Sequence, residues 1–117
     1  MGAGEDLLYD TSAVIELVAR RRRPVPGAVT ALTVVEYPPA AAYAVRVIYP
    51  RRIDYEHAAF LQALLRRRGS PLPAADLVIA AVAVNRGMKL ITLDKHFRVI
   101  EEVEPRLRVA YSLDEDS

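Results

Sequence analysis

Short runs of apolar residues alternate along the chain with longer stretches in which apolar residues recur at helical spacing. Such alternation is typical of a parallel α/β sheet, because each strand needs a crossover helix before the chain can return to the sheet. It is not the pattern of a helical bundle or a β-sandwich. The runs predict four strands, at Leu7–Tyr9, Ala28–Leu32, Met88–Leu93 and near Leu107–Tyr111.

Four helices are predicted between these strands. The third should be buried on nearly all sides, because the eight consecutive residues from Leu77 to Val84 are all apolar. The stretch from Thr33 to Pro50 carries no clear pattern, since Pro38 and Pro39 interrupt whatever begins at Thr33. The predicted helices cover Ala13–Val18 with a stop at Pro24, Pro26 and Gly27; a segment capped by Asp54 and ended by Gly69; Leu77–Val84 between Pro73 and Gly87; and a short segment from Lys95.

Length and composition indicate a globular chain with one core. We expect a single domain over residues 1–117, because a chain of this length buries a little over about 60% of its unfolded surface. Hydrophobic residues make up 52% of the chain, and no apolar run reaches the ~18 residues of a membrane span. Met1 to Tyr9 carries two acids and no basic residue, unlike a signal peptide, so a cytoplasmic location is expected.

The absence of cysteine restricts the possible metal chemistry. Disulfides and thiolate zinc sites are excluded, and His57 and His96 are too far apart in the sequence to form an imidazole site by themselves. Any metal should therefore be held by oxygen. Both histidines are expected to serve at the surface or in packing rather than as general bases.

The net charge of +1 hides two basic runs and an acidic end formed by Asp114, Glu115 and Asp116. The basic runs, Arg20–Arg23 and Arg66–Arg68, each close a predicted helix. Cations there complement the helix dipole, but they could equally contact the phosphates of a nucleic acid. Both interpretations stay open.

Four acids stand at positions where strands end or helices begin. Asp10 and Asp94 directly follow predicted strands, Glu36 lies four residues after another, and Asp76 opens the apolar helix. Each of them alone is explained by helix capping or by the helix dipole. In a parallel sheet, however, the acids that follow strands meet at one edge, where open α/β folds bind ligands. Because like charges repel, such a cluster calls for a cation such as Mg²⁺ or Mn²⁺.

Several of these segments together resemble the PIN domain family of nucleases. The resemblance rests on Leu72–Ala81, Gly87 and Leu90–Phe97, on Tyr9–Ser12 and on Thr33–Glu36, and it spans Leu7 to Tyr111. It implies a three-layer α/β/α fold with a central, mostly parallel sheet of four to five strands. It also implies a metal-dependent endoribonuclease, a hydrolase that uses Mg²⁺ or Mn²⁺. Single-domain members of this size mostly resemble VapC toxins, which implies an antitoxin partner and a possible homodimer.

The resemblance also implies roles for the four acids and their neighbours. Asp10 and Asp94 are the expected direct metal ligands, Asp76 would bind directly or through water, and Glu36 would orient the attacking water or hold a second ion. All four are therefore predicted as catalytic and metal-binding residues. Thr11, Ser12 and Thr92 would support these acids or bond locally within turns, and Lys95 would contact the substrate phosphate.

Two features depart from the family pattern. Pro38 and Pro39 should end the helix almost directly after Glu36, and the segment between Glu36 and Asp76 is shorter than usual. An RNA-processing or repair nuclease outside a toxin pair, or a catalytically silent PIN-like module that binds RNA or protein, remains an alternative. A haloacid-dehalogenase-type phosphatase is disfavoured because Ser12 stands where that chemistry needs a second acid. A receiver domain is disfavoured as well, because it would need paired acids after the first strand and a lysine at the end of a late strand, and the sequence has neither.

Overall fold

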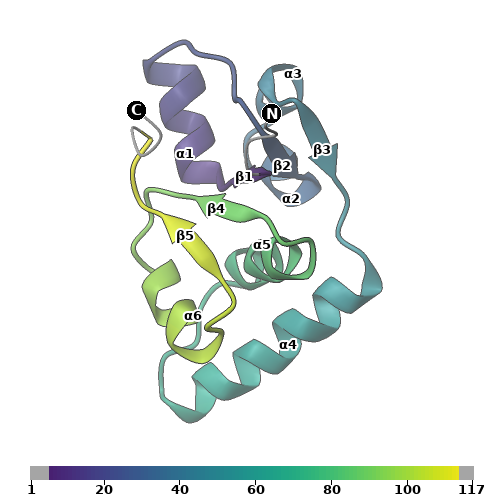
Figure 1. Cartoon of the computed structure of the whole chain (residues 1–117), viewed down its shortest axis with the longest axis vertical. Helices are drawn as coiled ribbons and strands as arrows, with labels where there is room; N and C mark the ends of the chain where they lie inside the picture. The colour runs from purple at the N-terminus through teal and green to yellow at the C-terminus, as the bar shows by residue number, and fades with distance from the viewer. Residues whose placement is uncertain (1–5, 114–117) are drawn as a thin grey trace.

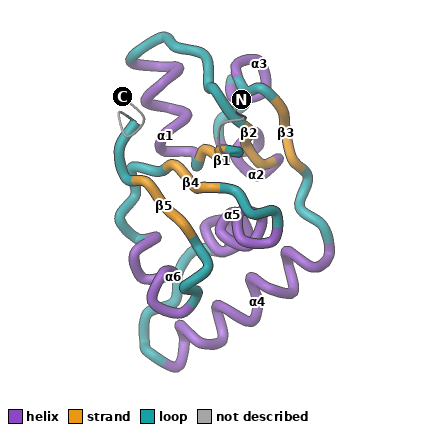
Figure 2. Tube along the Cα trace, viewed as in Figure 1, coloured by secondary structure: helices purple, strands orange, loops and turns teal. Residues whose placement is uncertain are grey.

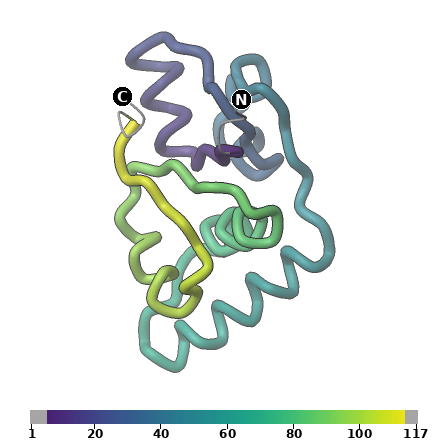
Figure 3. Tube along the Cα trace, viewed as in Figure 1, coloured from purple at the N-terminus to yellow at the C-terminus, as the bar shows by residue number. Residues whose placement is uncertain are grey.

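The structure is a computed structural model that describes residues 6–113, and its centre is a five-stranded parallel sheet (Figure 1). The strand order is β3-β2-β1-β4-β5, so β1 lies in the middle although it comes first in the sequence (Figure 3). Leu8 of β1 is in register with Ala28 on one side and Leu90 on the other. The predicted parallel sheet is thereby confirmed. The strands are β1 (Leu7–Tyr9), β2 (Ala28–Thr30), β3 (Arg46–Ile48), β4 (Lys89–Ile91) and β5 (Arg108–Ala110).

Helices cover both faces of this sheet, as the predicted three-layer fold requires. Figure 2 shows the strands in the middle, with α1 on one side and α4, α5 and α6 on the other. The helices are α1 (Thr11–Ile15), continued by a π-helical segment η1 (Glu16–Arg20), α2 (Ala31–Glu36), α3 (Ala40–Tyr43), α4 (Arg52–Arg67), α5 (Ala74–Asn85) and α6 (Phe97–Val103). Among the described residues, none of the helices combines the length and the apolar character needed to cross a bilayer.

Two hydrophobic cores lie on the two faces of the sheet, because successive side chains of a strand point to opposite sides. Leu8 and Leu90 belong to the core beneath α4, α5 and α6. Tyr9 and Ile91, the next residue on each strand, belong to the core beneath α1. Both faces are therefore apolar, which explains why the strands have unbroken apolar runs instead of alternating patterns.

Helix α5 is buried almost all round, as its composition predicts. Every residue from Leu77 to Ala83 is buried between the sheet and α4. The helix ends at Asn85, and Gly87 adopts a positive φ of 65° in the turn that leads into β4. Because α5 thus ends where β4 starts, its first turn lies at the opposite edge of the sheet, where β4 ends. The fold therefore determines at which edge of the sheet Asp76 lies, which the sequence alone does not.

The segment between Thr33 and Pro50 contains structure that the sequence pattern did not predict. It holds the end of α2, all of α3 and strand β3. Helix α2 does end at Glu36, as the prolines predict, but Pro39 then directly precedes α3, because proline is tolerated at the start of a helix. Strand β3 is short and buries only Ile48 fully, so it leaves little periodic signal.

One predicted strand and two predicted helix starts need correction. The strand predicted over Ala28–Leu32 ends at Thr30 and α2 begins at Ala31, because the hydroxyl of Thr30 caps that helix by accepting a hydrogen bond from the Thr33 amide at 3.3 Å. Asp54 is the third residue of α4 and not its cap; its carboxylate accepts from the Arg51 amide at 2.7 Å. The last helix begins at Phe97 and not at Lys95, because residues 92–96 form the turn that follows β4.

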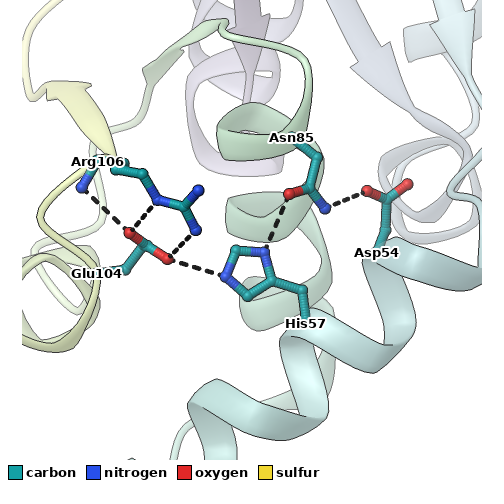
Figure 4. Close-up of polar contacts among 5 residues, drawn as sticks. All are labelled: Asp54, His57, Asn85, Glu104 and Arg106. Carbon is teal, nitrogen blue, oxygen red and sulfur yellow. Dashed lines mark hydrogen bonds and ion pairs between the residues drawn. The ribbon is translucent and has the colours of Figure 1, made fainter.

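A partly buried polar network links α4 to α5 and to the turn before β5 (Figure 4). Asn85 donates to Asp54 at 2.9 Å, and the two ring nitrogens of His57 lie 3.2 Å from Asn85 Oδ1 and 2.9 Å from Glu104 Oε1. Arg106 donates to both carboxylate oxygens of Glu104. Hydrogen bonds from Arg106 lower the pKa of Glu104 to about 2. His57 therefore has a structural role, and the network holds α4 against α5 and the turn before β5.

Candidate active site

The structure brings the four predicted acids together at the carboxyl edge of the sheet. Asp10 follows β1 and Asp94 lies three residues after β4, while Glu36 closes α2 and Asp76 stands in the first turn of α5. The charges of Asp10, Asp94 and Glu36 all act on Asp76. The four carboxylates therefore share one electrostatic environment, although 84 positions separate the first from the last in the sequence (94 − 10).

Asp10 is the most deeply buried of the four, with 4% of its surface exposed. Its Oδ2 accepts hydrogen bonds from Thr92 Oγ1 at 2.8 Å and from Ser12 Oγ at 3.0 Å. Burial raises the pKa of Asp10, and these hydroxyl hydrogen bonds oppose the rise. Asp10 also occupies the cap position of α1, and backbone hydrogen bonds from Thr11 and Ser12 in the first turn likewise lower its pKa. Asp10 therefore contacts both the start of α1 and the loop after β4.

The hydroxyl of Thr92 connects the two acids that follow the central strands. It donates to Asp10 and accepts from the Asp94 amide at 3.0 Å, and the side chain is fully buried. Ser12 adds a second link, because its hydroxyl accepts from the Leu93 amide at 3.0 Å. These bonds join the loops after β1 and β4, and the two hydroxyl groups hold the carboxylate of Asp10 in one orientation. Thr92 and Ser12 therefore support the position of Asp10.

Asp76 has the most strongly perturbed pKa of the cluster, raised to about 6. Burial is the main cause, followed by repulsion from Asp10, Asp94 and Glu36 in turn. Such a rise means that the ionised cluster is unfavourable without a neutralising charge. A divalent cation at this position would remove the penalty.

Glu36 is exposed but held in place by one strong hydrogen bond. Thr11 Oγ1 donates to Glu36 Oε1 at 2.6 Å, and the Thr33 hydroxyl lies 2.9 Å from the same Thr11 oxygen. Because the proton of Thr11 goes to Glu36, the hydroxyl of Thr33 must be the donor in the second bond. The threonine pair thus links α1 to α2 and holds Glu36 near the cluster despite the break at Pro38.

His96 joins the site, which the sequence analysis did not foresee. Its Nδ1 lies 3.1 Å from Asp94 Oδ1, and its backbone amide donates to the same oxygen at 2.9 Å. Asp76, Asp94 and His96 each offer a metal-ligating atom, and these atoms lie within 4.8 Å of one another. His96 is therefore a candidate nitrogen ligand beside the expected oxygen ligands. The sequence signal that could have indicated this is the short segment after Asp94, because a tight turn there brings the side chain of His96 back toward that of Asp94.

Some residues of the two arginine runs form structural contacts. Arg20 and Arg21 form ion pairs with Glu16 at 3.6 and 3.5 Å, and Arg68 pairs with Glu102 at 3.0 Å. Because these pairs account for three of the seven arginines in the two runs, both interpretations stay open. Lys95 is exposed beside Asp94, so its predicted contact with a substrate phosphate stays a prediction. The acidic run Asp114–Asp116 lies outside the described residues.

Comparison with known proteins identifies the family. The PIN domain family pattern matches residues 40–103, more than half of the chain, including Asp76, Asp94 and His96. No curated protein gives a significant match. Similar solved structures include DNA-bound VapBC from Salmonella typhimurium (18% identity, TM-score 0.73, covering 92% of this chain and 98% of that one). VapBC-5 from Mycobacterium tuberculosis shares 20% identity with a TM-score of 0.71, covering 93% and 100%. VapBC-1 from nontypeable Haemophilus influenzae shares 22% identity with a TM-score of 0.68, covering 89% and 96%. The chain therefore belongs to the PIN domain family.

Proposed function

We propose that this protein is a metal-dependent endoribonuclease and the toxin of a toxin–antitoxin pair. The observation that carries the proposal is the convergence of Asp10, Glu36, Asp76 and Asp94 at one sheet edge, with the pKa of Asp76 raised by burial and then by the other three. A protein gains no stability from such a cluster, so its presence is best explained by a function that needs the charge.

The donor set fits Mg²⁺ or Mn²⁺. These ions prefer carboxylate oxygens and keep several waters, so two or three carboxylates suffice as direct ligands. We assign Asp10 and Asp94 as direct ligands, Asp76 as a direct or water-mediated ligand, and Glu36 to orienting the attacking water or holding a second ion. When bound, such an ion supplies an activated water and offsets charge on the phosphoryl oxygens.

The residues of the chain prepare the site before substrate arrives. Thr92 and Ser12 fix the carboxylate of Asp10, and the His96 amide fixes that of Asp94, so little reorganisation is needed on binding. Thr11 occupies Oε1 of Glu36, which makes Oε2 the oxygen that we assign to orienting the attacking water. Lys95 is assigned to the phosphate of the substrate because it is exposed next to Asp94.

The toxin assignment is supported by the similar solved structures, which are VapBC assemblies. One of them, VapBC-5, is described as a member of the VapBC family of toxin–antitoxin systems. By analogy, the partner of this chain would be an antitoxin protein. A cytoplasmic location belongs to the same proposal because the substrate would be cellular RNA, and a homodimer belongs to it because the family resemblance implies one.

A cleavage assay on matched RNA and DNA oligonucleotides tests the activity. The purified protein should cut the RNA in Mg²⁺ or Mn²⁺, leave the DNA of the same sequence intact, and stop in excess EDTA. Cleavage that survives thorough chelation would refute the metal-dependent mechanism. A protein that binds RNA but never cuts it would instead be a silent binding module. Growth arrest on induced expression, relieved by an adjacent small gene, separates a toxin from an RNA-processing enzyme.

A further inference from the structure

His96 differs from every other candidate ligand because it offers nitrogen. It is the residue that precedes α6, and its ring Nδ1 lies 3.1 Å from Asp94 Oδ1, whereas its side chain makes no capping bond to that helix within the described residues. A ring nitrogen also lies within 4.8 Å of the ligand atom of Asp76. The three side chains therefore offer two oxygens and one nitrogen within a distance that a single ion can bridge.

The position of His96 is fixed even though its ring is exposed. Its amide donates to Asp94 Oδ1 at 2.9 Å, so the residue cannot move away without breaking that bond. The side chain is 67% exposed, and a polar contact at such an exposed site contributes little to stability. The ring can therefore exchange its contact with Asp94 for a cation at small cost, and the exchange needs no rearrangement of the core.

We propose that His96 ligates the divalent ion shared by Asp76 and Asp94 and makes the site select transition-metal ions such as Mn²⁺ over Mg²⁺. The inference rests on the proposed metal site and adds its selectivity. Its chemical basis is that Mg²⁺ favours oxygen donors and binds imidazole poorly, whereas transition-metal ions accept a mixed nitrogen and oxygen set. An exclusively carboxylate site would not discriminate in this way.

The test compares wild type with His96→Ala and with Arg52→Ala, a control at an exposed side chain of α4 outside the proposed site. Calorimetric titration with Mn²⁺ and with Mg²⁺ gives the two affinities, and pulsed electron paramagnetic resonance of the Mn²⁺ complex detects a coordinated nitrogen. We expect nitrogen coupling in wild type and Arg52→Ala and none in His96→Ala. We expect Mn²⁺ affinity to fall by about 10- to 100-fold in His96→Ala, the range known for disturbing a metal site, while Mg²⁺ affinity changes by less than roughly threefold.

Thermal scans in EDTA verify that His96→Ala stays folded, as expected for an exposed side chain. Mn²⁺ that binds wild type without nitrogen coupling, coupling that persists in His96→Ala, or an equal loss of affinity for both ions would overturn the role of His96. Each of those results leaves the carboxylate metal site intact. Failure of wild type to bind either ion at millimolar concentration would overturn both the inference and the metal site on which it depends.

Discussion

Replacing Asp76 with asparagine should stabilise the metal-free protein at neutral pH. Asn keeps the shape of Asp but removes the charge that Asp10, Asp94 and Glu36 repel. The pKa of Asp76 is about 6 in the folded protein, against 3.8 for an unperturbed group. Between about pH 4 and pH 6 the folded state thus holds a proton that the unfolded state has released. Stability contributed by this group is therefore lost as pH rises through that window.

The expected size follows from the shift of the pKa. A rise from 3.8 to about 6 corresponds to roughly 3 kcal/mol for a fully buried group. Asp76 is only partly buried, so solvent screening reduces this to about 1–2 kcal/mol. An acid in the first turn gains about 0.3–1 kcal/mol from the helix dipole, which the variant gives up. The net gain of Asp76→Asn is then about 1 kcal/mol, or roughly 4 °C in melting temperature for a chain of this size.

Thermal scans of wild type and Asp76→Asn in EDTA at several pH values from 4 to 8 measure this difference. The variant should melt higher at pH 7, and its advantage should shrink to nothing as pH approaches 4, where the wild-type side chain is also neutral. Glu56→Gln, a change at an exposed acid on α4, is the control and should show no such trend. If Asp76→Asn melts lower than wild type at pH 7, the acid is a helix-start residue and the electrostatic argument is wrong.

Three further results are expected. Mg²⁺ or Mn²⁺ at about 100 times its dissociation constant should stabilise wild type by roughly 2.7 kcal/mol, or on the order of 10 °C, and scans at matched ionic strength with EDTA check this. Thr92→Val removes the hydroxyl between Asp10 and the Asp94 amide, so it should cost about 1–3 kcal/mol and weaken metal binding by about 10- to 100-fold; an unchanged urea midpoint would contradict it. Glu104→Gln should cost about 1.5–3 kcal/mol at pH 7. Because the pKa of Glu104 is lowered to about 2, its stabilisation is present above about pH 4.5 and fades toward pH 2, and urea titrations at pH 7 and pH 3 should show a smaller penalty at pH 3.

The sheet and the buried helix were predictable because their local signals agree with their tertiary surroundings. β1 and β4 are apolar on both faces since helices cover both, and the apolar run of α5 matches its burial. The interval that contains α3 and β3 was not predictable. Proline usually interrupts structure, yet Pro39 precedes a helix here, and β3 buries only one residue completely.

The positions of three acids were predictable. Asp10 and Asp94 follow β1 and β4, and Glu36 ends the helix that follows β2. A parallel sheet brings such positions together at one edge. The edge occupied by Asp76 depends on the direction of α5, which only the fold fixes through the turn at Gly87. His96 was missed for a related reason. An isolated histidine says nothing about its neighbours until the turn after β4 brings its ring to Asp94.

The proposed function requires that the carboxylate cluster catalyse the cleavage of RNA. The most direct measurement is the single-turnover rate of RNA cleavage by wild type, Asp10→Asn and Asp94→Asn, purified in parallel and assayed in Mn²⁺, with Glu102→Gln as an exposed control. Asn preserves shape and capping ability but not the charge that holds a cation. We expect cleavage by wild type and Glu102→Gln, and none detectable by the two aspartate variants, whose melting curves should still show a folded protein. Rates within about threefold of wild type for either aspartate variant would contradict the assignment of these acids to catalysis.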